Sequence, residues 1–262
     1  MRIRNGLEGL VDEWLQVEPK GKPPHYRYRA AANELTRRTM PIAGTRAFLD
    51  AAYAQIHQNW LDAIDAGYTN PSKENWRWKR NLNMSPKNKS PETKLEKAVI
   101  DACGDNWSNQ IPVGSGLVGP NADRRVAIDL AHRKDPSTFS LIELKVASDN
   151  PLFAAIEILM YGLVFVWSKS NQEKLGYDLK TQPVLAANDI TLAVLAPGSY
   201  YDGCDLTELG SALNNALGEF GAQYGLALRF EFCELGEDYA EDSGSECVRS
   251  AISGRRRVWV SD

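Results

Sequence analysis

The chain has 262 residues, of which 43% are hydrophobic, and its formal net charge is −4 at pH 7. A chain of this length and composition can bury a sizeable core in one large or two small domains. Four scattered cysteines, three isolated histidines and the lack of an apolar secretory segment argue against a zinc site, a disulfide scaffold and a serine or cysteine hydrolase, and indicate a reducing, cytoplasmic location.

The first part of the chain, residues 1–89, is predicted to form a helical, basic accessory region. Apolar residues recur with helical spacing over residues 7–15 and 48–61. Residues 1–90 hold fifteen Lys and Arg against nine Asp and Glu, whereas the rest of the chain holds fifteen against twenty-five. We expect this small helical subdomain to pack against the remaining domain, or to serve as a DNA clamp or a dimer contact.

A short segment near the end of this region combines basic and aromatic side chains. Its positive charges can neutralise phosphates, and its tryptophans can stack on unpaired bases. The alternative is a solvated linker whose tryptophans dock onto the core. The candidate nucleic-acid-binding residues are Lys73, Trp76, Arg77, Trp78, Lys79 and Arg80.

A helix is predicted to begin after Ser90, because Ser is a preferred N-cap and Pro91 fits the first helical position. Apolar residues at helical spacing extend it through Ala102. Glu92 and Glu96 are four residues apart, so both lie beside the apolar stripe and either could face a sheet. The alternative is that both are ordinary solvated helix acids.

Two strands are predicted at Val126–Leu130 and Leu141–Val146, because aliphatic residues there alternate or run together between turn formers. The polar segment His132–Ser137, which contains a proline, fits a hairpin loop between them. The two strands are therefore expected to pair as an antiparallel hairpin.

Three charged side chains are expected to gather on one side of this apolar hairpin. Side chains alternate between the faces of a strand, so Glu143 and Lys145 share the face opposite the aliphatic residues. Pairing about the loop centre puts Asp129 across from residues 141–143. Charges leave water at a cost unless they are paired or bind a metal, so such a cluster needs a reason. The alternative is a solvated surface pair of little energetic consequence.

The remaining elements are read from the same patterns. The apolar run Pro151–Trp167 is short for a bilayer and has Glu157 near its centre, so it is predicted to be a buried helix that crosses the sheet. The segment Glu237–Ser245, rich in acids, Gly and Ser, is expected to be a mobile loop. Further elements are a strand at 190–195, a helix at 206–224, a strand at 226–233 and a last strand near Val258.

Over about residues 90–260 the chain resembles the PD-(D/E)XK nuclease superfamily. The resemblance lies in the order of three elements: a helix that carries Glu, a strand that carries Asp and a strand that carries Glu-x-Lys. The resemblance implies a restriction-endonuclease-like domain over residues 90–262, built from a helix, a β-meander, a second helix and a further strand. The fold class would be α/β (α+β), with a central mixed sheet flanked by helices and the N-terminal helical subdomain added.

The same resemblance implies roles for individual residues. Asp129, Glu143 and the backbone carbonyl of Leu144 would bind a divalent metal, with Glu96 near it directly or through water, and Lys145 would orient or activate the attacking water. The residues Glu157 and Tyr161 are similar to a Gln-x-x-x-Tyr signature of exonuclease-like branches, with Glu in place of Gln. A further departure is Ile128, which stands where the motif has Pro before Asp129.

Carboxylates suit this chemistry because Mg²⁺ prefers oxygen ligands and binds through one or two carboxylates while keeping several waters. Lys145 could hold the attacking water, stabilise charge in the transition state or lose its proton if it is desolvated. These three roles stay open at this point.

We therefore expect a Mg²⁺-dependent nuclease, with Mn²⁺ able to substitute, that cleaves DNA through a metal-activated water. The alternatives are a non-catalytic protein that retains the fold and binds nucleic acid or a partner protein, and a hydrolase of another phosphate ester or an unrelated α/β enzyme. We expect no membrane association. Cutting both strands of a duplex would favour a homodimer.

Overall fold

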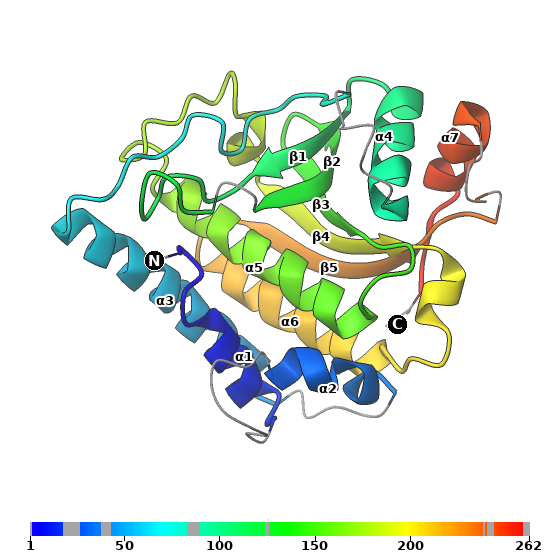
Figure 1. Cartoon of the computed structure of the whole chain (residues 1–262), viewed down its shortest axis with the longest axis horizontal. Coiled ribbons are helices and arrows are strands. Elements are labelled where there is room, and N and C mark those ends of the chain that lie inside the picture. The colour runs from blue at the N-terminus through cyan, green and yellow to red at the C-terminus, as the bar shows by residue number, and fades with distance from the viewer. Residues whose placement is uncertain are drawn as a thin grey trace.

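The structure is a computed structural model, and it contains a mixed α/β fold around one central sheet (Figure 1). It describes residues 2–17, 27–37, 43–82, 90–123, 126–237, 239 and 244–258. Statements about what the structure contains or lacks refer to these residues.

The sheet has six strands in the spatial order in which they occur along the chain. The first three form an antiparallel meander, the next two run parallel to the third, and the last is antiparallel to the fifth. The strands are β1 (Trp107–Pro112), β2 (Ala127–Asp135), β3 (Thr138–Leu144), β4 (Asp189–Ala196), β5 (Ala227–Glu234) and β6 (Arg256–Arg257).

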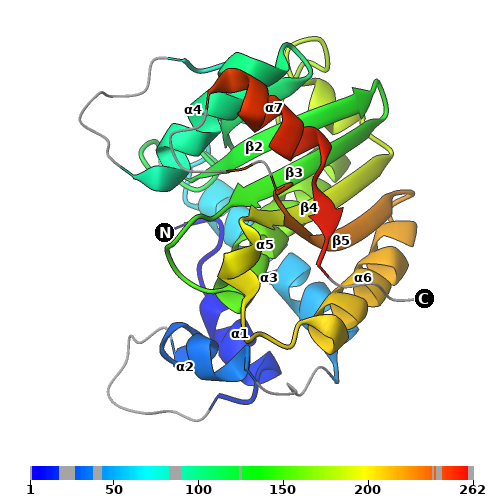
Figure 2. The same cartoon turned by 90° about the vertical axis from the view of Figure 1, so that its right-hand side faces the viewer.

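Helices cover both faces of the sheet, which gives three layers (Figures 1 and 2). The helices α4 (Pro91–Cys103) and α7 (Ser245–Ser253) pack together on one face, and α5 (Pro151–Ser170) and α6 (Thr207–Ala222) cover the other. Outside α5 and α6 lie the N-terminal helices. These are α1 (Leu7–Trp14), α2 (Arg27–Leu35) and α3 (Thr45–Asp65).

Alternation along the strands decides which side chain meets which helical layer. In β4, Leu192 and Val194 belong to the hydrophobic cluster under α5, whereas Ala193 and Leu195 belong to the cluster under α4 and α7. In β3, Ile142 and Leu144 share one face, as predicted, and belong to the cluster under α4 and α7, so Glu143 between them is directed to the α5 side.

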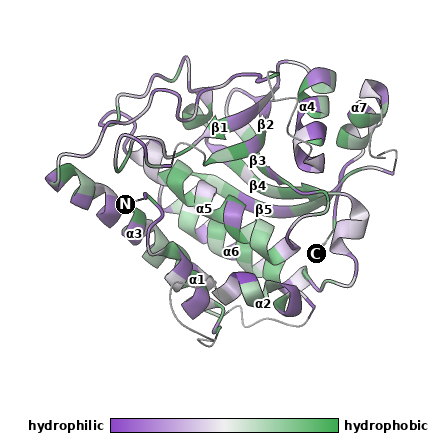
Figure 3. Cartoon of the chain, viewed as in Figure 1, coloured by the Kyte–Doolittle hydropathy of each residue, from purple (hydrophilic) through white to green (hydrophobic). Residues whose placement is uncertain are grey.

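The helix α5 is the apolar centre of the fold, and the prediction that Pro151–Trp167 is a buried core helix is confirmed. It is long and apolar enough to cross a membrane, but 94% of its 18-residue apolar stretch is buried inside the protein. Figure 3 shows the hydrophobic colouring concentrated in α5 and in the strands behind it. Asn150 caps this helix, because its side-chain oxygen accepts the Phe153 N–H at 3.0 Å.

The N-terminal helices share one hydrophobic cluster with α5 and α6. Trp14 of α1 stacks on Phe48 of α3 with ring centroids 4.7 Å apart, and Trp60 of α3 meets Trp167 of α5 edge to face at 5.2 Å. The expectation of helices before the sheet is confirmed. The division into domains at residues 89 and 90 stays a prediction.

Two sequence-based expectations need correction. The predicted loop His132–Ser137 is too long, because β2 continues to Asp135 and residues 132–133 pair with residues 139–140 of β3. Polar side chains suggested a loop, but backbone pairing needs no apolar residue where a strand projects to the surface. The turn is held by Asp135, whose carboxylate accepts the Ser137 N–H at 2.8 Å. The second correction is β3 itself, which ends at Leu144 rather than at Val146.

Five elements of the described residues went unpredicted: the strand β1, the helices α2 and α7, and two short 3-10 helices at Pro183–Ala186 and Gly198–Tyr201. The helix α7 begins at Ser245, the residue that was expected to end a mobile loop. Most of the Glu237–Ser245 segment lies outside the described residues. The predicted strand near Val258 is present as the short β6 just before it, and the Val258 N–H donates to the Phe232 carbonyl.

The helix α5 packs tightly on the sheet at Gly162, where a Cβ atom would overlap the Leu192 side chain of β4. We predict that Gly162→Ala lowers the free energy of unfolding by about 1–3 kcal/mol, because Leu192 is fully buried and cannot move aside. Gly218→Ala in α6 is the matched control, since a Cβ atom there meets nothing within 4 Å. The control should gain up to about 1 kcal/mol from helix propensity. Urea titration measures both, and equal effects would contradict the packing argument.

Candidate active site

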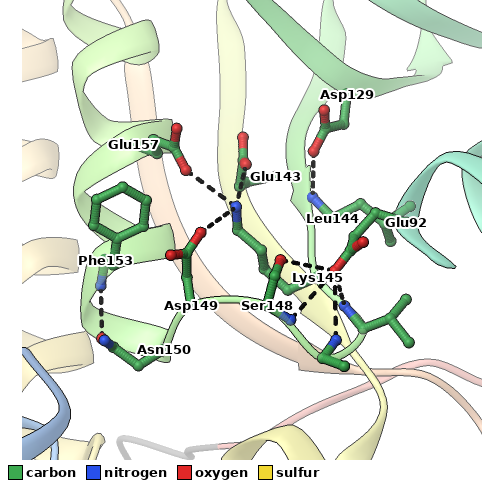
Figure 4. A network of polar contacts seen from close by, with 12 residues as sticks. Glu92, Asp129, Glu143, Leu144, Lys145, Ser148, Asp149, Asn150, Phe153 and Glu157 are labelled. Atoms are coloured by element: carbon green, nitrogen blue, oxygen red, sulfur yellow. Dashed lines mark hydrogen bonds and ion pairs between the residues drawn. The ribbon is translucent and has the colours of Figure 1, made fainter. Parts of the chain in front are cut away.

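The β2–β3 hairpin brings the predicted acidic residues together. Leu130 pairs with Ile142, so Asp129 lies beside the end of β3, in agreement with the expected register. The Asp129 Oδ2 atom accepts the Leu144 N–H at 3.0 Å. Figure 4 shows the Asp129 carboxylate at this edge of the strand, next to the side chains of Glu143 and Lys145.

The Lys145 ammonium lies inside a group of three carboxylates (Figure 4). Its Nζ atom is 2.9 Å from Glu143 Oε1, 3.1 Å from Glu157 Oε2 and 3.6 Å from Asp149 Oδ2. Glu143 and Lys145 are 5% and 7% exposed, so this ion pair is buried. The surface-pair alternative therefore does not describe it. Glu157 is contributed by the second turn of α5 and Asp149 by the loop before that helix.

Burial and mutual charge shift the protonation of these groups. Burial raises the pKa of Glu143 well above its ordinary value, and the charges of Asp129 and Glu157 raise it further against the lowering effect of Lys145. Burial also raises the pKa of Asp129 to about 6, although the Leu144 N–H and the Lys145 charge act to lower it. Burial alone would lower the pKa of Lys145, but Glu143 and Glu157 outweigh it and raise the pKa. The lysine therefore stays an ammonium ion.

Glu96 is the acid of α4 that lies near Asp129. It is 3% exposed, and its carboxylate accepts from the Asn109 amide at 2.6 Å and from the Gln110 amide at 2.8 Å. Both amides belong to β1, in which Gln110 has a left-handed φ of 50°. Burial raises the pKa of Glu96 to about 7, and the Asp129 charge adds to the rise against the two amides.

Glu92, the other acid of α4, holds the backbone that follows β3. Its Oε1 atom accepts from the N–H groups of residues 146, 147 and 148 at 3.3–3.4 Å and from the Ser148 hydroxyl at 2.8 Å. Burial acts to raise the pKa of Glu92, but the hydrogen bonds from Ser90, Ser148 and these amides lower it to about 2. Glu92 therefore fixes the loop that follows Lys145, whereas Glu96 lies beside Asp129.

Tyr161 lies one helical turn after Glu157 on α5 and is 6% exposed. Burial and the charges of Glu143 and Glu157 raise the pKa of its hydroxyl. Arg4, from the segment before α1, lies over the Tyr161 ring with its guanidinium carbon 5.1 Å from the centroid. The two residues of the predicted signature thus lie at the edge of the acidic group.

The basic segment at residues 73–80 runs beside β1, and the Lys79 carbonyl accepts the Asn109 N–H at 3.4 Å. Trp76 is fully buried and meets Phe165 of α5 edge to face, so its ring belongs to the core and the alternative of a docked tryptophan holds there. Arg77 and Lys79 pair with Glu74, and Arg80 pairs with Asp105. Trp78 packs on Phe139, and Lys73 is exposed. A nucleic-acid role for the residues other than Trp76 stays a prediction.

The donor atoms that are present fit a hard divalent cation at Asp129 and Glu143. No group of three or more Asp, Glu, His and Cys side chains in the described part of the chain is arranged to hold a metal ion by itself. Mg²⁺ does not require such a group, because it binds through one or two carboxylates and keeps its waters. Burial raises the pKa of both carboxyl groups, so their ionised forms would gain from a cation bound beside them.

Several residues of this site were not foreseen from the sequence. Asn109 and Gln110 hold Glu96, and Asp149 adds a third carboxylate beside Lys145. Asn109 and Gln110 could have been identified from the sequence, because two amide side chains inside the short segment Trp107–Pro112 need hydrogen-bond partners when the segment is buried. Asp149 offered none, because its position depends on how the loop enters α5.

Comparisons with protein-family models, with curated proteins and with solved structures find no match for this chain. The resemblance to the PD-(D/E)XK superfamily therefore stays a prediction. The chemistry of the site is argued from its own residues.

The raised pKa of Glu96 predicts a pH-dependent stability. Glu96 ionises near pH 4.5 in the unfolded chain and near pH 7 in the folded one, so the folded chain binds the extra proton between these values. The free energy of unfolding should therefore fall as pH rises from about 4.5 to about 7. Glu96→Gln removes this pH dependence. In EDTA the free energy of unfolding of the variant should therefore exceed that of wild type by a margin that grows to about 3 kcal/mol as pH rises from about 4.5 to about 7.

Glu92→Gln in the same helix is the contrasting control. The pKa of Glu92 is lowered to about 2, so its carboxylate stabilises the fold above pH 4.5 and this contribution is lost as pH falls toward 2. The control should lose stability at pH 7 and approach wild type in acid. Urea titrations from pH 2 to pH 8 measure both variants, and parallel profiles for Glu96→Gln and wild type would refute the assignment.

Proposed function

We propose that this protein is a metal-dependent nuclease that hydrolyses phosphodiester bonds in DNA. One observation carries the proposal. A buried Glu143–Lys145 ion pair lies beside Asp129 at the carboxyl end of β3, where two antiparallel strands end against α5. Buried charges are costly to keep, and strongly shifted carboxyl pKa values occur most often at functional sites.

The topology supports a restriction-endonuclease-like core. The chain runs from α4 through the β1–β2–β3 meander into α5 and then into β4, which is the order that the resemblance implies. The acids lie on the elements expected for them: Glu96 on the first helix, Asp129 on the second strand and Glu143 on the third.

The residues that would hold the metal are Asp129 and Glu143, with the Leu144 carbonyl as the backbone ligand and Glu96 near them. When bound there, Mg²⁺ supplies a water of lowered pKa and neutralises negative charge on the phosphate. The protein's part is to orient these oxygens. The Leu144 N–H fixes Asp129, and the β1 amides fix Glu96.

Among the three roles open for Lys145, its surroundings favour charge stabilisation and the holding of a water. The raised pKa keeps the amine protonated, which argues against its acting as a neutral base. Two carboxylates and the loop fixed by Glu92 hold the ammonium in place. An ammonium so held costs little reorganisation when negative charge develops on a substrate phosphate.

We predict that Asp129→Asn lowers the rate of Mg²⁺- or Mn²⁺-dependent cleavage of single-stranded and plasmid DNA by about two orders of magnitude or more. The side chain keeps its shape and still accepts the Leu144 N–H, and it removes a buried carboxylate whose pKa is raised, so the variant in EDTA should melt no lower than wild type. Mn²⁺ should raise the melting temperature of wild type and not that of the variant.

Asp135→Asn is the matched control, because Asp135 lies at the other end of β2, is exposed, and only holds the hairpin turn. It should cleave DNA as wild type does. Cleavage by Asp129→Asn at the wild-type rate would refute the nuclease proposal. Retained nucleic-acid binding without cleavage by wild type would favour a non-catalytic binding protein that has this fold.

A further inference from the structure

A polar cavity of about 840 Å³ adjoins the candidate active site on the N-terminal side. It lies between the segment before α1, the start of α2, the loop before β2 and the helix α5. Three arginines line it, namely Arg2, Arg4 and Arg29.

Aromatic rings of α5 hold two of these guanidinium groups beside the active site. The Arg4 carbon Cζ lies 5.1 Å from the Tyr161 ring centroid, and that of Arg29 lies 4.4 Å from the Phe153 ring centroid. The Lys145 ammonium is itself 5.8 Å from the Phe153 centroid. The Arg4 guanidinium, stacked on a ring in this way, can offer its N–H groups to an oxyanion. The Arg4 Nε atom is buried and has no hydrogen-bond partner within the described residues.

The cavity borders the candidate active site at Glu157. This residue lines the cavity and also forms the 3.1 Å ion pair with Lys145. A molecule that fills the cavity would therefore lie next to the place where a phosphodiester would be cut.

Three acids also line the cavity, namely Glu8, Asp123 and Glu157. Glu157 is paired with Lys145, and Asp123 is 7% exposed and accepts the Ile3 N–H at 2.9 Å. The remaining acid is Glu8, which is close enough to Arg29, Arg4 and Arg2 for their charges to lower its pKa, although burial raises it more. Glu8 therefore competes with any bound anion for the same arginines.

We propose that this cavity binds a phosphate-bearing nucleotide of an unpaired DNA strand next to the bond that is cut. Its volume is that of a small-molecule pocket, typically about 300–1,000 Å³, which suits a nucleotide and not a duplex. The arginines supply the phosphate contacts, and Val126 and Met160 add apolar lining. The inference rests on the proposed nuclease function, because it names the part of the substrate that the N-terminal region would hold.

The test is a binding titration of a short 3′-labelled single-stranded DNA in EDTA, which prevents cleavage, at several salt concentrations. The double variant Arg4→Gln with Arg29→Gln should raise Kd by about tenfold or more. It should also reduce the salt slope of log K by about 1.4, since each phosphate contact on a single strand contributes about 0.7. Glu8→Gln should bind several times more tightly than wild type.

The matched control removes two arginines elsewhere, with Arg46→Gln and Arg229→Gln together. These two pair with acids away from the cavity, Arg46 with Asp50 and Arg229 with Asp189. The control should bind as wild type does, and thermal melts check that both double variants are folded. Equal losses in the two double variants, or unchanged binding in the cavity variant, would overturn the inference. Equal competition by a blunt duplex of the same sequence would overturn the unpaired strand as the occupant.

Cleavage by the same proteins separates the two proposals. Arginine-dependent binding without metal-dependent cleavage by wild type would leave the cavity assignment standing and reject the nuclease. Cleavage by wild type, together with unchanged binding in the cavity variant, would retain the nuclease and reject the cavity as a substrate site.

Discussion

The buried ion pair between Lys145 and Glu143 is the interaction on which the arrangement of the site depends. Two charges that are 7% and 5% exposed would be expensive to bury alone, so the fold surrounds them with partners: Glu157 from α5, Asp149 from the loop, and Asp129 beside Glu143. The tight packing of α5 on β4 at Gly162 fixes the helix that carries Glu157. Replacement of the pair by apolar residues would serve stability as well, which makes its presence an argument for function.

The two acids of α4, Glu92 and Glu96, have different surroundings, which shift their pKa values in opposite directions. Glu92 is wrapped by backbone N–H groups and hydroxyls, which stabilise its charge. Glu96 is buried beside another carboxylate, which favours its neutral form. One therefore orders the loop after Lys145, and the other is available to share a cation with Asp129 in the proposed reaction. Two residues four positions apart on one helix thus have opposite electrostatic properties.

The N-terminal region reaches the site by a route other than the basic segment at residues 73–80. In that segment Trp76 is in the core, and the charges of Arg77, Lys79 and Arg80 are met by neighbouring acids. The segment before α1 and the start of α2 instead place arginines against rings of α5. The count of charged residues along the sequence indicated a basic N-terminal region. The packing of that region on α5 determines which of its arginines lie beside the carboxylates around Lys145.

Local patterns were enough to predict the helix after Ser90, the buried helix after Pro151 and the face shared by Ile142 and Leu144, because capping, periodicity and alternation act within a few residues. They also put Asp129, Glu143 and Lys145 close together, since a hairpin is itself local. Only the tertiary structure decided that Glu157 would meet Lys145, that Asn109 and Gln110 would hold Glu96, and that Arg4 would lie on Tyr161. Those contacts join segments that are far apart in the sequence or belong to different helices and strands. Their geometry is set by how α4 and α5 pack on the two faces of the sheet, which no short stretch of sequence encodes.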